Sequence, residues 1–466
     1  MPDTSHVYKP HKPQESQYYR CIKDNFEKLE QVYDDRFPKK YGFLRPYVKQ
    51  VIYRYLDCGI LHNGFARVKR GECGHEYLLA FSCKRRYFCP SCHQKRVVEF
   101  GEWLCQEVLK AVPHRHFVFS IPKILRRYFL YDRKLLSDLS RCGWESLKEF
   151  FKETVPENGA VPGAVIAIQT FGDFLGFNPH LHVLCSDGCF SGEGMFRVAP
   201  RFETKHIESI FRHKVFKMLL SKDKITEDLV ELLMSWRHSG FSVFSGPRIQ
   251  PRDEEAMENL ARYIIRASFS QERMTYIPEE SKVIYRSKDD KKEMDFDALE
   301  WIAAMCSHVP NKGEQMVRYY GFYSNVSRGK RKNQDQDDLI PSILEPDGSS
   351  SEYRKNWARL IQKIYEVDPL TCPKCSGKMK VISVIEDEDV IKKILKHLGL
   401  WDQKARPPPK SNSAPIAPQY HIDYTDSQLR ASDNYLVPIH KWSFRSLAGS
   451  LTCPISALCS KNNPRR

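Results

Sequence analysis

The chain has 466 residues and carries 73 lysine and arginine residues against 58 aspartate and glutamate residues, which gives a net charge of +15. This length exceeds what one hydrophobic core accommodates, so we expect about two to four domains. The surplus of positive charge indicates a polyanionic partner, most simply nucleic acid. No run of about 18 apolar residues occurs, so the sequence predicts no membrane-spanning helix and no membrane partner.

The first residues and the cysteines indicate a reducing compartment. Residues 1–6 lack the apolar segment of a signal peptide, so we expect a cytoplasmic protein. The sequence contains 15 cysteines, which are not expected to form a disulfide framework in such a compartment. Because these cysteines are clustered along the chain, they favour metal binding.

Residues 1–57 are predicted to form a helical arm. Phe26, Leu29 and Tyr33 recur at helical spacing, and a second apolar and basic run covers residues 46–56. This segment carries no chemical motif. Packing against the rest of the protein and contact with DNA are both compatible with its pattern.

A zinc-binding module of the zinc-ribbon type is predicted over residues 58–105. Its clearest motif is a Cys-Pro-x-Cys turn, which presents two thiolates to one tetrahedral metal ion, and cysteines upstream complete the site. We predict the zinc ligands Cys73, Cys83, Cys89 and Cys92, with Cys58, His75 and His93 in reserve.

Basic side chains are interleaved with these cysteines. A small metal-stabilised module that carries several cations is suited to contact with phosphates. The candidate nucleic-acid contacts in this module are Arg85, Arg86, Lys95 and Arg96.

Two apolar runs farther along the chain are predicted to be buried strands. Residues 116–121 have the composition of a central strand. His114 and His116 stand at its start beside an arginine, and we interpret them as structural or phosphate-contacting side chains in preference to metal ligands. Residues 163–172 form the second run, which is rich in β-branched residues and bounded by glycines.

A third strand is predicted to carry the chemistry. Because side chains alternate along a strand, His180 and His182 point the same way, while Leu181 and Val183 point into the core behind them. An isolated His-x-His motif is more often structural, but imidazole also suits divalent metals. The loop to the strand at 163–172 is short, so we expect an antiparallel hairpin that places Gln169 beside the histidines. Gln169 is then a third metal ligand or a hydrogen-bond partner that closes the hairpin.

A helix is predicted from Arg252 to Ser268, with acidic residues in its first turn. Tyr263 and Arg266 lie on a face next to its apolar stripe. A lone helical tyrosine is usually the edge of a core, so only its context identifies Tyr263 as a nucleophile. Farther on, Arg318 and Tyr319 belong to an aromatic segment that is suited to stacking on bases or to closing a core edge.

The C-terminal part contains a second Cys-Pro-x-Cys motif. Residues 331–361 are predicted to be a charged linker, and residues 362–402 to form a knuckle followed by a strand and a helix. Cys372 and Cys375 supply two ligands of a possible second zinc site, and Cys453 and Cys459 are candidates for the others. Residues 403–466 are predicted to be a flexible tail.

The order of these motifs resembles that of rolling-circle insertion-sequence transposases (the IS-ninety-one group). The resemblance covers roughly residues 45–402, and it rests on the joint order of blocks such as Cys89-Pro90-Ser91-Cys92, Asn178-Pro179-His180-Leu181-His182, Leu260-Ala261-Arg262-Tyr263, Arg318-Tyr319-Tyr320-Gly321 and Cys372-Pro373-Lys374-Cys375. It implies an α+β fold, in which residues 106–330 form an HUH nuclease domain. Such a domain is an antiparallel sheet flanked by helices, of the ferredoxin or RRM-like kind, and here it follows an N-terminal zinc-ribbon module.

The resemblance also implies a chemistry and a partner. Mg²⁺ or Mn²⁺ is held by His180 and His182, with Gln169 as the candidate third ligand, while zinc is structural. Tyr263 attacks a phosphate of DNA to form a 5′-phosphotyrosine, and either the metal or Arg266 helps the phenol to ionise. The partner is single-stranded DNA from the ends of the element, in a bacterial cytoplasm near the nucleoid.

The sequence departs from the family pattern in two ways. Arg70 stands where a leading cysteine is typical, three residues before Cys73, so Cys58 or His75 is a candidate replacement. Asn259 and Ala267 stand where some members carry a second tyrosine, so we expect a single-tyrosine enzyme. Two alternatives remain: a replication initiator or relaxase with the same chemistry, and a non-catalytic zinc-dependent nucleic-acid-binding protein.

Overall fold

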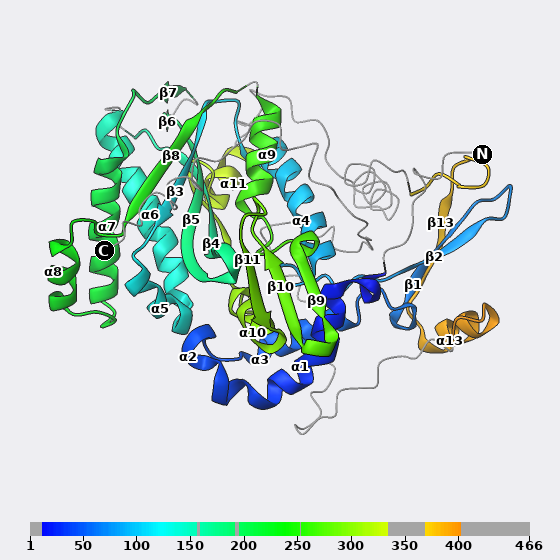
Figure 1. Cartoon of the computed structure of the whole chain (residues 1–466). Helices are drawn as coiled ribbons and strands as arrows, with labels where there is room; N and C mark the ends of the chain where they lie inside the picture. Colours follow the sequence, from blue (N-terminus) through cyan, green and yellow to red (C-terminus); the bar gives the residue numbers. More distant parts are fainter. Residues whose placement is uncertain (1–11, 156–158, 192–194, 252, 334–368, 402–466) are drawn as a thin grey trace.

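The computed structural model describes residues 12–155, 159–191, 195–251, 253–333 and 369–401 (Figure 1). These residues form a mixed α+β structure whose sheets are antiparallel, which confirms the predicted fold class at that level. The predicted tail at 403–466, including Cys453 and Cys459, lies outside the described residues, as does most of the predicted charged linker.

A five-stranded antiparallel sheet forms the centre of the molecule. Its strand order is β12-β4-β5-β3-β8, so the two strands that carry the histidines lie side by side in the interior of the sheet. The predicted hairpin is confirmed, because β4 and β5 pair along most of their lengths. The strands are β3 (His114–Ser120), β4 (Gly163–Phe171), β5 (Phe177–Ser186), β8 (Ser242–Ile249) and β12 (Val317–Gly321).

One face of this sheet is covered by apolar helices. Leu181 and Val183 of β5 are fully buried there, together with Phe117 and Phe119 of β3, in one hydrophobic core. This burial explains the alternation of residues along β5, because the opposite set of side chains is then directed to the other face. The covering helices, at the left of Figure 1, are α5 (Lys123–Tyr131), α6 (Lys134–Thr154) and α7 (Thr204–Leu220).

The other face of the sheet is covered by α4 (Pro90–Trp103) and α9 (Glu254–Ile264). Phe100 of α4 and Ala261 of α9 pack in one core with Leu184 of β5. The remaining elements of this part are β6 (Gly188–Phe190), β7 (Phe196–Val198), α8 (Glu227–Ser235) and α11 (Asn325–Asn333).

The predicted helical arm is packed against a distant part of the chain. Its helices share a hydrophobic core with α10 and with a second sheet, in which Trp301 of α10 is fully buried. Packing is therefore the role that the structure gives to this arm. The elements are α1 (Gln17–Arg36), α2 (Pro38–Tyr41), α3 (Pro46–Leu56), β9 (Met274–Ile277), β10 (Lys282–Arg286), β11 (Glu293–Asp297) and α10 (Ala298–His308).

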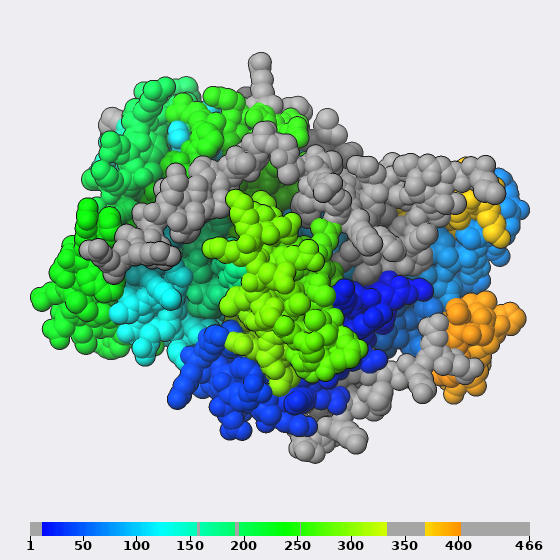
Figure 2. Space-filling model, viewed as in Figure 1, coloured from blue at the N-terminus to red at the C-terminus, as the bar shows by residue number. Residues whose placement is uncertain are grey.

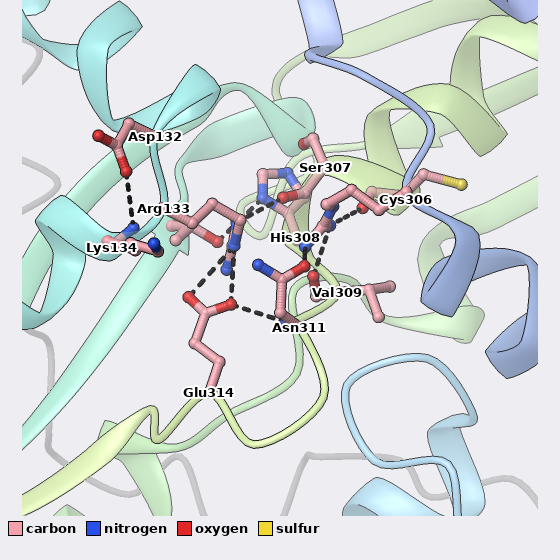
Figure 3. Close-up of polar contacts among 11 residues, drawn as sticks. Asp132, Arg133, Lys134, Cys306, Ser307, His308, Val309, Asn311 and Glu314 are labelled. Atoms are coloured by element: carbon pink, nitrogen blue, oxygen red, sulfur yellow. Dashed lines mark hydrogen bonds and ion pairs between the residues drawn. The ribbon is translucent and has the colours of Figure 1, made fainter.

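Two arginines hold the loop that follows α10. Arg45 donates to the carbonyl oxygens of Cys306 and Val309 at 2.8 and 2.6 Å. Arg133, at the start of α6, donates to the carbonyl oxygen of Ser307 at 2.9 Å and to the carboxylate of Glu314, as Figure 3 shows. Since charged donors satisfy these carbonyl groups, the loop is fixed between the arm and the central part of the molecule.

A third sheet joins the two ends of the described chain. Strand β1 (Phe65–Lys69) pairs on one side with β2 (Glu76–Ala80) and on the other with β13 (Lys380–Ile385). In Figures 1 and 2, β13 and α13 (Glu388–His397), in yellow and orange, lie beside the light-blue β1–β2 hairpin. The C-terminal knuckle and the zinc-binding segment, which we predicted as separate regions, therefore share one sheet.

We predict that His308 makes the protein less stable in mild acid. His308 is 3% exposed, and its Nε2 lies 2.9 Å from the carbonyl oxygen of Leu175 and its Nδ1 3.2 Å from Thr170 Oγ1. Burial lowers its pKa to about 4. Because an unfolded histidine binds a proton below about pH 6.5, the folded state loses stability as the pH falls from 6.5 towards 4.

The loss of unfolding free energy between pH 7 and pH 5 should be smaller in His308→Gln than in the wild type, by about 2 kcal/mol at most. Denaturant unfolding at the two pH values measures this difference. His238→Gln changes an exposed histidine and serves as the control, which should retain the wild-type pH dependence. An identical pH dependence in all three proteins would contradict the prediction.

Candidate active site

The two histidines of β5 converge within the central part of the molecule. His180 and His182 are 8% and 2% exposed, and their Nε2 atoms are 3.1 Å apart. His180 Nδ1 lies 2.7 Å from the carbonyl oxygen of Asn178, so this nitrogen carries the hydrogen and Nε2 keeps its lone pair. Burial is the largest cause that lowers the pKa of both imidazoles, to about 4 for His180, and the positive charge of Arg266 acts in the same direction. Both side chains are therefore neutral at neutral pH, which is the form that binds metals.

His116 joins this pair, although the sequence analysis did not include it in the site. Its Nε2 lies 3.0 Å from His182 Nδ1, and the two rings stack with their centroids 5.2 Å apart. This contact fixes the orientation of the His182 ring and directs its Nε2 towards His180. His114, in contrast, contacts the hydroxyl of Tyr323 at 2.7 Å, which is a structural role. The second His-x-His motif was a signal for His116, but only the pairing of β3 with β5 gives it a partner.

Gln169 lies opposite His180 in the pairing of β4 with β5, as predicted. Its Nε2 donates to the carbonyl oxygen of Ile264 at 2.8 Å, so the amide contacts the end of α9 and does not close the hairpin. Its Oε1 is buried and has no hydrogen-bond partner within the described part of the chain. Leaving a buried acceptor unpaired costs about 1–3 kcal/mol. This orphaned oxygen is consistent with a site that a ligand completes.

Helix α9 brings Tyr263 to the histidines. The centroid of the Tyr263 ring lies 5.4 Å from that of His182 and 6.3 Å from that of His116, and it is nearly perpendicular to both. The guanidinium carbon of Arg266 lies 4.8 Å from the centre of the tyrosine ring. Arg266 is exposed, whereas Tyr263 is partly buried. The structure therefore gathers Gln169 of β4, the histidines of β5 and the tyrosine and arginine of the α9 region.

Helix α9 is shorter than the predicted helix, which ran to Ser268. It ends at Ile264, where the Gln169 amide satisfies the Ile264 carbonyl oxygen. The next carbonyl oxygen, that of Ile265, lies 2.8 Å from Nε2 of His93 on α4. Because these tertiary contacts take the place of further helical hydrogen bonds, the chain turns at this point and Arg266 lies beyond the helix.

Four cysteines form a compact cluster at the end of α3 and the start of α4. They are Cys58, Cys83, Cys89 and Cys92, and their Sγ atoms all lie within 4.8 Å of one another. Two of the separations, Cys58 to Cys89 and Cys83 to Cys92, are 3.9 and 3.7 Å. A tetrahedral zinc ion with Zn–S bonds of about 2.3 Å requires about 3.8 Å between sulfurs. The cluster therefore fits a structural zinc ion.

The predicted ligand set for this cluster was wrong in one member. Cys58, held in reserve, takes the place that we assigned to Cys73. The physical reason is a pair of backbone contacts: Gly59 N donates to the carbonyl oxygen of Phe81, and Cys83 N lies 3.3 Å from Cys58 Sγ. Cys73 instead lies beside Cys372 and Cys375, with Sγ separations of 3.5 and 3.4 Å. His75 belongs to neither cluster in the described part of the chain.

Two of the predicted nucleic-acid contacts are buried. Lys95 is 7% exposed and lies 3.4 Å from Glu99, one turn along α4. Tyr319 is 9% exposed, and its ring packs edge-on against Trp103 at 5.7 Å, so its faces are not open to a base. These two predictions are wrong because neither side chain is exposed to a nucleic acid. The partly exposed residues Arg85, Arg86, Arg96 and Arg318 stay predictions.

Comparisons with known proteins place these features in a family. The family model described as "Transposase zinc-binding domain" matches residues 28–121, and the model described as "Putative transposase" matches residues 163–331. The first match contains the four-cysteine cluster, and the second contains the histidines of β5 together with α9. No solved structure matches the chain. Within the described residues, no helix combines the length and the apolar character needed to cross a membrane.

Two relatives resemble the chain over most of their own length. "Putative transposase y4qJ" of Sinorhizobium fredii (strain NBRC 101917 / NGR234) is 26% identical over 343 residues, which cover 68% of this chain and 84% of the relative. The transposase for insertion sequence element IS801 of Pseudomonas savastanoi pv. phaseolicola is 22% identical over 371 residues, which cover 74% of this chain and 85% of the relative. With a zinc-binding domain and a transposase domain matched in the order that the motifs predicted, the chain belongs to the IS91 family of transposases.

Proposed function

We propose that this transposase cuts and rejoins single DNA strands through a 5′-phosphotyrosine formed on Tyr263. The observation that carries the proposal is the position of the Tyr263 ring, 5.4 Å from a buried histidine whose Nε2 faces a second histidine. A tyrosine that only packs at the edge of a hydrophobic core does not require two buried histidines beside its ring. A nucleophile needs a group that holds its phosphate, and the histidines with Gln169 offer one.

The residues fit a divalent metal such as Mg²⁺ or Mn²⁺. Two ligand atoms at right angles on an octahedral ion are about 3 Å apart when the bonds are about 2.1 Å long. The Nε2 atoms of His180 and His182, at 3.1 Å, meet this requirement. Gln169 Oε1, buried and unpaired, is the candidate third ligand. When bound, the metal would polarise a phosphoryl oxygen and orient the phosphate.

The side chains around the metal site then carry out the steps on the DNA. The Tyr263 hydroxyl oxygen forms a bond to phosphorus while the bond from phosphorus to the 3′ oxygen breaks, and the 3′ oxygen takes up a proton. Attack by a 3′ hydroxyl reverses this step and releases the tyrosine, so the strand is rejoined without ATP. A phenol is mostly protonated at neutral pH. The Arg266 guanidinium, 4.8 Å from the ring centre, is placed to favour the phenolate.

One tyrosine is available on this helix. Position 259 is Asn, one turn before Tyr263, and position 267 is Ala, which lies beyond the end of α9. One subunit therefore holds one covalent DNA end at a time. A reaction that joins two ends would proceed by successive attacks or would use a second subunit.

The proposal favours transposition over two alternatives. A replication initiator or relaxase would use the same chemistry, but the proteins that resemble this chain are named as transposases. A non-catalytic zinc-dependent DNA-binding protein would have no use for an unpaired Gln169 oxygen beside paired histidines and a tyrosine. DNA is the partner in each case, in accord with the net charge of +15.

Tyr263→Phe should abolish a covalent adduct between the protein and DNA, because the phenol oxygen forms the bond to phosphorus. The assay incubates the protein and Mn²⁺ with end-labelled single-stranded oligonucleotides from the termini of its element and resolves the products on a denaturing gel. Tyr47→Phe, which changes a tyrosine of α3 in the helical arm, is the control and should form the adduct normally. An adduct that survives in Tyr263→Phe would rule out this nucleophile.

Metal binding is tested by the concentration of Mn²⁺ that supports adduct formation. His182→Ala should reduce the adduct rate about 100-fold or more, because it removes a ligand. Gln169→Leu should raise the half-saturating Mn²⁺ concentration about tenfold and recover much of the rate at high Mn²⁺. His114→Gln is the matched control on β3. If Gln169→Leu leaves the Mn²⁺ dependence unchanged, Gln169 is not a ligand.

A further inference from the structure

Two loops that lie more than 290 residues apart in the sequence have the same backbone hydrogen bonds. In the first loop, Arg70 N donates to the carbonyl oxygen of His75 at 2.8 Å, and Gly74 N donates to that of Arg70 at 3.1 Å. In the second, Cys372 N donates to the carbonyl oxygen of Gly377 at 2.9 Å, and Ser376 N donates to that of Cys372 at 2.8 Å.

The backbone conformations agree as well. Gly74 and Ser376, the fifth residues of the two loops, are both left-handed, with φ of +70° and +55°. Position 70 therefore corresponds to Cys372, and Cys73 corresponds to Cys375. A loop of this form presents side chains at its first and fourth positions to one metal ion. By this correspondence, Arg70 stands where the first loop would carry its own first cysteine.

The two loops lie together at one end of the sheet formed by β1, β2 and β13. Cys73 Sγ lies 3.5 Å from Cys372 Sγ and 3.4 Å from Cys375 Sγ, and the three sulfurs form one group. These distances are close to the roughly 3.8 Å between thiolates that share a tetrahedral zinc ion. The pairing of Lys69 with Lys380, next to the loops, holds them in this position.

The Arg70 side chain packs against the second loop. Its Nη1 donates to the carbonyl oxygen of Lys378 at 2.9 Å, and its guanidinium carbon lies 2.5 Å from where a Cβ on Gly377 would be. Its Nε is buried and has no hydrogen-bond partner in the described part of the chain. Its Nη2 forms an ion pair with the exposed carboxylate of Glu72. The guanidinium is therefore held between Glu72 and the second loop.

We infer that Cys73, Cys372 and Cys375 form a second zinc site, bound by three thiolates, in which Arg70 stands at the loop position where a fourth cysteine would be. Thiolates select a soft cation such as zinc. Three thiolates and one Zn²⁺ carry a net charge of −1. The Arg70 guanidinium supplies a neighbouring positive charge, which it shares with the exposed carboxylate of Glu72. Because a guanidinium stays protonated and cannot coordinate the ion, the fourth position is filled by water or a small solvent ligand. Cys372 and Cys375 lie outside the residues that match the zinc-binding family model.

This site would fasten the C-terminal knuckle to the β1–β2 hairpin, independently of the chemistry proposed for Tyr263. The apolar core beneath it is small and consists of Ala66, Val68, Leu79, Cys372 and Met379 with a few partly buried neighbours. A module with so small a core depends on additional links for its stability. Zinc at the second site would supply such a link across the two ends of the described chain.

The first test counts the zinc ions on the full-length protein by native mass spectrometry. The wild type should carry two, one in each cluster, and Cys73→Ser and Cys375→Ser should each carry one. Cys105→Ser changes a cysteine that belongs to neither cluster and should keep two. A wild type with one zinc ion, unchanged in Cys73→Ser and Cys375→Ser, would overturn the inference.

The second test adds a ligand instead of removing one. Arg70→Cys should complete a four-thiolate site and slow the release of the second zinc ion to a chelator at least about tenfold relative to the wild type. Arg70→Ser removes the guanidinium without adding a thiolate and should release that ion no more slowly than the wild type. Equal release from Arg70→Cys and Arg70→Ser would show that position 70 does not face the ion. Arg70→Cys gains a ligand and loses none, so it tests the inference even where Cys73→Ser and Cys375→Ser fold poorly.

Discussion

The register of β5 between β4 and β3 is the constraint on which the candidate active site depends. Side chains alternate along a strand, so a slip of one residue would turn both histidines into the core beneath α5, α6 and α7. It would turn Leu181 and Val183 towards the face covered by α4 and α9. Leu181 and Val183 are fully buried in an apolar core, so the slip would lose the free energy of burying them there. With this register, Gln169 lies opposite His180, and His116 of the other neighbouring strand reaches His182.

The polar groups of the site also determine where α9 ends. The Gln169 amide binds the last carbonyl oxygen of the helix, and the same side chain leaves its own oxygen unpaired beside the histidines. Gln169 of β4 therefore connects the central sheet to α9, the helix that carries Tyr263. A buried network of this kind is sensitive to any missing partner, so the position of Tyr263 depends on a side chain of β4.

The two cysteine clusters each join segments that are separate in the sequence. The first joins the end of α3 to the start of α4, the helix that covers the histidine face of the central sheet. The second lies where β13 returns to β1. The second cluster thus connects distant segments of the described chain above a small apolar core. The cysteines of the first cluster belong to the large core of the helical arm.

Local patterns in the sequence determined much of the active site. Strand alternation places His180 and His182 on one face, a short loop predicts the β4–β5 hairpin, and a Cys-Pro-x-Cys turn joins Cys89 to Cys92, because each pattern depends only on neighbouring residues. The exchange of Cys58 for Cys73, the contact of His116 with His182 and the burial of Lys95 and Tyr319 were decided by tertiary structure. Each depends on which distant segments pair or pack, and single-chain periodicity carries no information about those contacts.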